Sequence, residues 1–304
     1  MVLSVRDKSE TSSFLFDSSE TSFNVSSTIV LVYAFFILAY DRIKSMKVGD
    51  EMSTIAFTHI GNLRQENEDS YYYNELENIY IVADGIGGHQ GGRDASRLAI
   101  KAFLHIYDQY KESSLEKVIE SGFRFANEQV FHYQNTHFPN GLVGTTLTVI
   151  ILRKNKVYLG HVGDSRAYLY TFADKLVQIS EDHTYYAELA KYDNKTSMKI
   201  KSNTLNDKKN FLLKAIGPEK EVSVQIDSYE VKGDFILLLA TDGLYRYILI
   251  DEIVEIVEKN KNLALVSDRL KSLALSRGGK DNLTMIIHTM EEGDLDEPKI
   301  RGTI

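Results

Sequence analysis

The stretch "IYIVADGIGGHQGGRDAS", Ile79–Ser96, contains the change of pattern that decides the fold. Its apolar run, Ile79–Ala83, has the length of a buried β-strand and ends directly in Asp84-Gly85. Four more glycines follow within seven residues, and a helical pattern then begins. An isolated Asp-Gly pair most often forms a turn, because glycine adopts positive φ without steric cost. The alternative is a site in which a strand-end carboxylate faces a ligand that the glycines allow to come close.

Acidic residues recur at the ends of other predicted elements, in "RQENEDSYYY", "YLGHVGDSRAYLY", "FILLLATDGLY" and "GGKDNLTMIIH". Each of these residues alone is more often part of a turn or a solvated charge. Together they place several carboxylates where one sheet edge could gather them. Carboxylate oxygens suit Mg²⁺ and Mn²⁺. Two such ions about 3.5–4 Å apart can activate a water for attack on a phosphoryl group.

The composition is that of a globular protein and excludes several classes of function. The net charge of −8 and the lack of a basic stripe argue against a nucleic-acid-binding protein. The sequence contains no cysteine, which excludes disulfides, zinc–thiolate sites and a cysteine nucleophile. This is compatible with a reducing cytoplasm, where we expect the protein.

Periodicity predicts a single α+β domain. Short polar links such as "RKNK" join successive apolar runs, which indicates antiparallel meanders rather than βαβ units. The predicted strands are "STIAFTHIG" from Ser53 and the runs Ile79–Ala83, Leu147–Leu152, Val157–Val162, Ala167–Tyr170, Phe235–Ala240 and Leu283–His288. Apolar residues at helical spacing predict helices over Asp94–Tyr110, Ser114–Gln134, Asp251–Lys259 and Leu263–Ser276.

We divide the chain into an extension (1–51), a catalytic domain (52–292) and an acidic, polar tail (293–304). The extension is rich in Ser and Thr and includes the apolar run Ile29–Tyr40, which is shorter than the ~20 residues of a membrane-spanning helix. The run Ile29–Tyr40 is either a membrane anchor or a helix docked on the body. A third alternative is that the extension is upstream sequence and that translation starts at Met46 or Met52. Membrane contact is expected only if residues 29–40 anchor the chain.

The order of the motifs resembles the metal-dependent protein Ser/Thr phosphatases of type 2C, and most closely their bacterial branch. Matching stretches run in family order from about Ile60 to Ile287, and no single one would be convincing. They are "RQENEDS", "VADGIGGHQGGRDAS", "VGTTLTVIIL", "GHVGDSRAYLY", "ISEDHT", "LLKAIG", "LLLATDGLY" and "GGKDNLTMII". The resemblance implies a four-layer α-β-β-α sandwich of two antiparallel sheets, flanked by antiparallel helices, with a di-metal site at one edge.

The resemblance also implies roles for the direct metal ligands. Asp84 resembles the aspartate that bridges the two Mn²⁺ or Mg²⁺ ions, and the backbone carbonyl of Gly85 binds one of them. Asp242 and Asp281 resemble the other direct ligands. Asp164 resembles a ligand of a third, weaker ion in the bacterial branch, shared with Asp242. The alternative for Asp164 is that it only braces its turn.

Further residues surround these ligands in the resemblance. Glu68 and Asp69 match an acidic pair that mostly holds metal-bound water, with Asp69 closest to an ion. Asn282 matches a residue outside the ligand set that fixes Asp281. Arg64 matches the arginine that grips the substrate phosphate, and a guanidinium fork fits phosphate oxygens well.

The histidines are harder to assign. His89 lies in the glycine loop, where the resemblance suggests a general acid for the leaving alkoxide, and both a catalytic and a non-catalytic role are left open. For Asp182 and His183 we expect structural hydrogen bonding, and for His161 packing inside a strand. The stretch between His183 and Leu212 matches the family weakly, so substrate preference does not transfer.

The function implied is hydrolysis of phosphoserine and phosphothreonine by direct attack of a metal-bridging water. The expected partners are phosphoproteins and a cognate Ser/Thr protein kinase, and the protein is expected to be a monomer. One alternative is a non-catalytic phosphoprotein-binding regulator, against which the intact set of Asp84, Asp242 and Asp281 argues. Another is a phosphatase of anti-sigma-antagonist proteins.

Overall fold

The computed structural model describes residues 53–88, 90–171, 175–192, 211–260 and 262–290. All of them belong to one compact unit, Arg42–Ile304. The predicted segments 1–51 and 293–304, the run Ile29–Tyr40 and His89 lie outside the described residues. The division of the chain into extension, domain and tail therefore stays a prediction. Among the described residues, no helix is both long and apolar enough to cross a bilayer.

The described strands form two five-stranded antiparallel sheets and one two-stranded ribbon. The first sheet has the order β1 (Thr54–His59), β12 (Leu283–Met290), β11 (Phe235–Ala240), β8 (Arg166–Thr171) and β9 (Lys175–Gln178). The second has the order β10 (Gln225–Glu230), β7 (Lys156–Val162), β6 (Leu147–Arg153), β3 (Ile79–Ala83) and β2 (Ser70–Asn74). The ribbon pairs β4 (Gly85–Ile86) with β5 (Gly144–Thr145).

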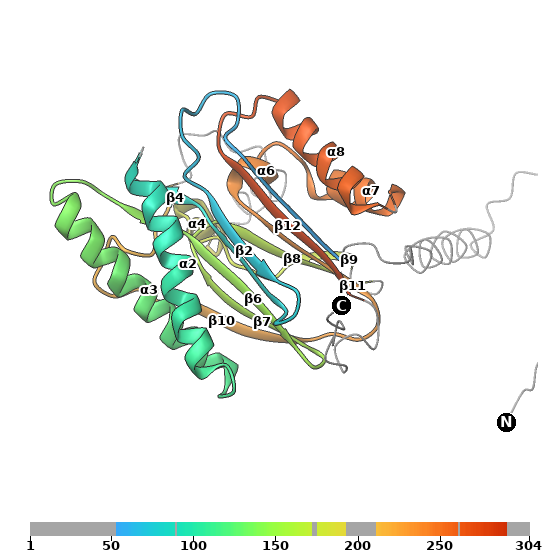
Figure 1. The fold of residues 1–304 in the computed structure, drawn as a ribbon. Helices are drawn as coiled ribbons and strands as arrows, with labels where there is room; N and C mark the ends of the chain where they lie inside the picture. The colour runs from blue at the N-terminus through green and yellow to red at the C-terminus, as the bar shows by residue number, and fades with distance from the viewer. Residues whose placement is uncertain (1–52, 89, 172–174, 193–210, 261, 291–304) are drawn as a thin grey trace, which may run out of the picture. The chain divides into compact units, whose positions relative to one another are not determined.

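Two pairs of helices cover the outer faces of the sheets (Figure 1). Helices α2 (Gln90–Tyr110) and α3 (Leu115–His137) share a core with the second sheet. Helices α7 (Ile250–Lys259) and α8 (Leu263–Ser276) share another with the first sheet. Two short helices, α4 (Tyr185–Ala190) and α6 (Asp242–Tyr245), lie in the connections. The predicted four-layer α-β-β-α sandwich is confirmed.

The period of two in the strands explains why the apolar runs are continuous. In β3, Ile79 and Ile81 pack toward α2 and α3, whereas Tyr80 and Val82 pack toward the other sheet. Both faces are therefore buried, and every residue of β3 is apolar. Since burying one large apolar side chain contributes ~1.5–3 kcal/mol, these inner strands contribute strongly to the stability of the core.

Most predicted elements are confirmed, with small differences at their ends. All seven predicted strands and all four predicted helices are present. Helix α2 begins at Gln90, before the predicted start at Asp94. Its first turn contains Gly91 and Gly92, and glycine is a weak helix former, so the sequence gives no helical signal there. Strands β2, β9 and β10 were not among the predicted elements.

Candidate active site

Strand register brings the predicted acidic residues together at one end of the sandwich. In the second sheet Ser70 pairs with Ala83 in an antiparallel register. Asp69, just before β2, and Asp84, just after β3, are therefore neighbours at the same end of the sheet. In the first sheet Ala240 pairs with Met285. Asp242, which follows β11, and Asp281, which precedes β12, therefore lie at the same end of this sheet. The carboxylates expected from the sequence thus lie in two pairs, one from each sheet.

A hydrogen bond joins the two pairs. The hydroxyl of Thr241, just after β11, donates to Asp69 Oδ2 at 2.8 Å. The same hydroxyl accepts from the backbone N–H of Thr284 in β12 at 2.9 Å. Thr241 is fully buried, so this contact links the two sheets directly beneath the acidic residues. Sequence reasoning missed Thr241, although it precedes Asp242 in the motif.

Asn282 holds the segment that carries Arg64 and Glu68. Its side-chain amide donates to the carbonyls of Ile60 and Glu66, at 2.9 and 3.0 Å. Its carbonyl oxygen accepts from the backbone N–H of Glu68 at 2.8 Å. The backbone N–H of Asn282 donates to Asp281 Oδ1 at 2.9 Å. The Asn282 side chain therefore fixes the segment Ile60–Glu68, while only its backbone N–H contacts Asp281, and the role expected for Asn282 stays a prediction.

Two glycines allow the backbone segments of the site to approach one another closely. A Cβ on Gly85 would lie 2.2 Å from the carbonyl oxygen of Gly92 and 2.7 Å from that of Glu68. A Cβ on Gly243 would lie 1.9 Å from the carbonyl oxygen of Asn282. Both contacts are to backbone, which cannot give way as a flexible side chain can. The glycine after each strand-end aspartate is therefore required for packing.

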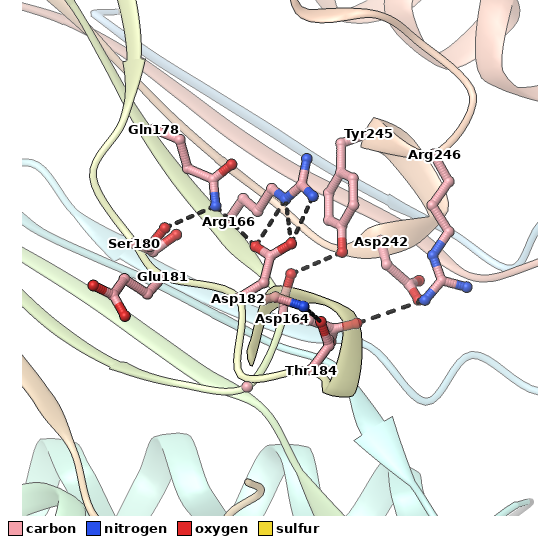
Figure 2. Close-up of polar contacts among 12 residues, drawn as sticks. Asp164, Arg166, Gln178, Ser180, Glu181, Asp182, Thr184, Asp242, Tyr245 and Arg246 are labelled. Atoms are coloured by element: carbon pink, nitrogen blue, oxygen red, sulfur yellow. Dashed lines mark hydrogen bonds and ion pairs between the residues drawn. The ribbon is translucent and has the colours of Figure 1, made fainter. Parts of the chain in front are cut away.

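Asp164 reaches the same end through a turn that crosses between the sheets. β7 belongs to the second sheet and β8 to the first, and Gly163 between them has φ +119°. The carbonyl oxygen of Asp164 accepts from the Tyr245 hydroxyl at 2.9 Å. Figure 2 shows Asp164, Asp242 and Tyr245 gathered at this point. The turn thus adds a buried carboxylate beside Asp242.

Two arginines form ion pairs with these carboxylates. Arg64, whose side chain is about half exposed, places Nη2 2.9 Å from Asp281 Oδ2. Arg246 places Nη2 2.7 Å from Asp242 Oδ2 and 3.6 Å from Asp164 Oδ2. Sequence reasoning missed Arg246, although its spacing of four residues from Asp242 at the start of a helical turn is a signal for an ion pair.

The electrostatics of the cluster disfavour a set of fully ionised carboxylates. Burial raises the pKa of Asp69 to about 7, and the charges of Asp242 and Asp281 add to the rise. Burial also raises the pKa of Asp164 to about 7, which Asp242 increases and Arg246 opposes. The pKa of Asp84 is raised well above its usual value by burial, and the four neighbouring aspartates contribute further. Such a cluster is stabilised by positive charge, supplied by protons, arginines or cations.

Two oxygens of the cluster are open to a cation. Among the described residues, Asp69 Oδ1 and Asp242 Oδ1 are buried and have no hydrogen-bond partner. Buried polar atoms are nearly always paired, so these two oxygens fit a hard cation. As the described side chains stand, no group of three or more His, Asp or Glu residues is arranged to hold a metal ion. The carboxylate oxygens are the type of donor that Mn²⁺ and Mg²⁺ prefer. In this structure Arg64 and Arg246 instead neutralise Asp281 and Asp242.

Residues for which a structural role was expected are placed in the frame beneath the site. His161 is buried in β7, where its Nδ1 lies 2.9 Å from Thr148 Oγ1 and its ring stacks on His183. Asp182 accepts from Arg166 Nε and Nη2, at 2.9 Å to Oδ1 and 2.6 Å to Oδ2. Figure 2 shows this pair beside Tyr245. Both residues therefore have the structural contacts that the sequence predicts.

Comparison with known proteins gives a consistent result. The family model for protein phosphatase 2C matches residues 59–285. The serine/threonine phosphatase stp of Listeria welshimeri is 32% identical over 241 residues, covering 76% of this chain and 92% of the relative. The crystal structure of the Mycobacterium tuberculosis phosphatase PstP/Ppp superimposes with a TM-score of 0.70 at 30% identity, covering 79% of this chain and 98% of the other. A structure of the PstP catalytic domain in complex with two manganese ions superimposes with a TM-score of 0.67 at 29% identity, covering 78% and 98%.

The chain belongs to the protein phosphatase 2C family. The prediction that it is a protein serine/threonine phosphatase is thereby confirmed. The roles assigned to individual site residues stay predictions.

Proposed function

We propose that the protein hydrolyses phosphoserine and phosphothreonine in phosphoproteins, using Mn²⁺ or Mg²⁺ held at the acidic end of the sandwich. Asp84, Asp242 and Asp281 would hold the ions, together with the carbonyl of Gly85. The observation that carries the proposal is the pair of buried, unpartnered oxygens on Asp69 and Asp242, which come from different sheets. When bound, the ions would supply an activated water and charge stabilisation for direct attack on phosphorus.

The chain's own residues supply the remaining steps. Asp281 accepts from Arg64 in this structure. If Asp281 held an ion, the Arg64 guanidinium would be available for two phosphate oxygens. Glu68 would hold ordered water beside the ions, and Asp69, whose Oδ1 has no hydrogen-bond partner among the described residues, would lie closest to an ion. His89 would give a proton to the leaving alkoxide. His89 lies outside the described residues, so this role rests on the sequence alone.

The test is release of phosphate from a phosphothreonine peptide and from p-nitrophenyl phosphate, in Mn²⁺ and after EDTA. We expect turnover in Mn²⁺ for both substrates and its loss in EDTA, with recovery when Mn²⁺ is restored. Binding of the phosphopeptide without turnover in Mn²⁺ would instead support the non-catalytic regulator. Turnover that EDTA leaves intact would contradict the metal-dependent mechanism.

We further propose that the protein opposes a Ser/Thr protein kinase, because its reaction removes the group that such a kinase adds. That it acts as a monomer stays a separate prediction. The measurement is a comparison of phosphoproteomes with and without the protein. We expect a set of phosphoserine and phosphothreonine sites, including sites on a kinase, to rise in its absence. An unchanged phosphoproteome would contradict this assignment.

A further inference from the structure

The guanidinium of Arg246 lies between two buried carboxylates that come from different sheets. Its Nη2 is 2.7 Å from Asp242 Oδ2 and 3.6 Å from Asp164 Oδ2. The two carboxylate side chains are only 10% and 8% exposed. Asp242 follows β11 and Asp164 follows β7, so one arginine serves both sheets. This edge of the acidic cluster, defined by Asp164 and Asp242, already contains a cation supplied by the chain.

The position of Arg246 is determined by its surroundings. Its backbone N–H donates to the Asp242 carbonyl at 3.1 Å, which closes the single turn of α6. The preceding residue, Tyr245, fixes the backbone of Asp164 through its hydroxyl. The Tyr245 ring packs on the guanidinium of Arg166 at 3.8 Å, and Asp182 holds that guanidinium in turn (Figure 2). Arg246 therefore starts from a rigid anchor and needs no rearrangement to reach both carboxylates.

The two oxygens of Asp242 have different environments. Oδ2 accepts from Arg246, whereas Oδ1 is buried and has no hydrogen-bond partner among the described residues. An ion held by Oδ1 leaves the arginine pair intact. An ion placed between the Oδ2 atoms of Asp164 and Asp242 would lie against the guanidinium that both atoms face, where the like charges repel. The geometry thus separates one oxygen for an external cation from one oxygen for the arginine.

We propose that Arg246 is a built-in cation that excludes divalent ions from the Asp164–Asp242 edge. Mn²⁺ or Mg²⁺ then binds only on the side of Asp84 and Asp281. This departs from the third ion that the family resemblance implies at Asp164. The inference rests on the proposed function only in the identity of the ions on the other side.

The test counts Mn²⁺ bound per chain by equilibrium dialysis of the full chain, with Mn²⁺ alone as the probe. The variants are Arg246→Ala, Asp164→Asn and the two combined. Arg277→Ala is the matched control, because it removes an exposed arginine from a surface pair with Glu252. We expect Arg246→Ala to bind one more Mn²⁺ than wild type, weakly, and the double variant to lose it again. Asp164→Asn alone and Arg277→Ala should keep the wild-type count.

Two results would overturn the proposal. One is a wild-type count for Arg246→Ala, since the arginine would then exclude nothing. The other is the loss of one ion in Asp164→Asn alone, since the edge would then bind an ion despite the arginine. Should Arg246→Ala fail to give a cooperative melt, the Asp164→Asn count decides by itself. Wild type without any bound Mn²⁺ would refute the proposed function, while the difference between Arg246→Ala and wild type would still decide the role of Arg246.

Discussion

Asp84 lies where β3 ends, and burial together with the charges of four other aspartates raises the pKa of its carboxyl group. A metal ligand in such a cluster costs stability when no cation is bound, because like charges are held together. The same arrangement gives a cation its affinity. Residues of this kind are therefore expected to trade stability of the metal-free protein for function.

We predict that Asp84→Asn and Asp242→Asn each abolish Mn²⁺-dependent turnover and leave the metal-free protein folded, with a melting temperature equal to or above that of wild type. Removing one charge weakens ion binding and relieves repulsion within the cluster. The measurements are phosphate release at saturating Mn²⁺ and thermal melting in EDTA. Asp108→Asn is the control, because Asp108 is an exposed aspartate on α2. Activity like that of wild type in either site variant would refute the ligand assignment.

Arg64→Ala is expected to raise KM for p-nitrophenyl phosphate roughly tenfold, since a charged hydrogen bond contributes about 1.5–3 kcal/mol. The effect on kcat should be smaller, because Arg64 binds the phosphate in the ground state as well as in the transition state. Steady-state kinetics of Arg64→Ala and Arg64→Lys separate the two parameters. A collapse of kcat at unchanged KM would instead make Arg64 a residue that acts in the transition state alone.

His161 is expected to make the stability of the protein depend on pH. Burial lowers its pKa to about 4 in the folded chain, from 6.5 for a solvated histidine. The neutral ring therefore contributes stability that is fully present above pH 6.5 and is lost as the pH falls to about 4. The free energy of unfolding of wild type minus that of His161→Gln should fall by roughly 3 kcal/mol between neutral pH and about pH 4.

The measurement for His161 is chemical unfolding of both proteins across this pH range. Taking the difference between the two proteins cancels the shared groups that lie away from His161, whereas His183, which stacks on His161, contributes to the measured change together with it. His132→Gln is the control, because His132 is exposed on α3. A stability difference that does not change with pH would show that His161 is not held neutral in the fold.

At the scale of elements, the sequence predicted the inner strands well because both of their faces are buried. Strands β3 and β11 are apolar throughout and stand out from their flanks. Strands β2, β9 and β10 are edge strands, and edges carry polar or half-exposed residues that blur the pattern. The motif "RQENEDSYYY" supplies predicted ligands, and its last four residues begin β2.

A buried ion pair joins β8 to the segment after β9, and it provides a prediction for these elements. The side chains of Arg166 and Asp182 are each 8% exposed. Asp182→Ala leaves the guanidinium buried without its partner, so we expect a loss of about 3–5 kcal/mol in the free energy of unfolding. The measurement is urea unfolding in EDTA.

The matched control for Asp182→Ala is Glu255→Ala, which breaks an exposed pair with Lys259 on α7 and should cost no more than about 1 kcal/mol. Replacing both Arg166 and Asp182 with apolar residues of similar volume should recover much of the loss. A cost for Asp182→Ala no larger than that of the control would show that the pair is not a structural support of the site.

At the scale of the whole molecule, the sequence predicted which acidic residues meet but not how they are neutralised. Asp84, Asp242 and Asp281 were recognisable because each flanks a buried strand in a motif. The pairings of Arg64 and Arg246 depend on contacts between segments and on a single helical turn, α6, that is too short to give a periodic signal. Thr241 likewise acts through a contact with Asp69, which lies 172 residues away in the sequence.

The predicted boundary of the catalytic domain gives a test of the whole chain. β1 begins at Thr54, and its pairing with β12 closes the first sheet. The carbonyl of Ser53 accepts from the Thr289 N–H at 2.8 Å, so Ser53 adds one more backbone contact between this edge of the first sheet and the segment at β12. Every predicted site residue lies after Ile60. A chain that starts at Met46 or Met52 therefore retains all contacts of the described fold.

We predict that such a truncated chain is soluble and as active as the full chain, because the deletion removes none of the described residues of the sandwich and no predicted site residue. Phosphate release in Mn²⁺ and thermal melting of the two chains provide the comparison. If the run Ile29–Tyr40 docks on the body, truncation should lower the melting temperature by several degrees, since each large buried side chain contributes ~1.5–3 kcal/mol. If the run is an anchor, only the full chain should sediment with membranes. An insoluble or inactive truncated chain would show that the extension belongs to the catalytic domain, because the sheets and the site would then depend on residues before Ser53.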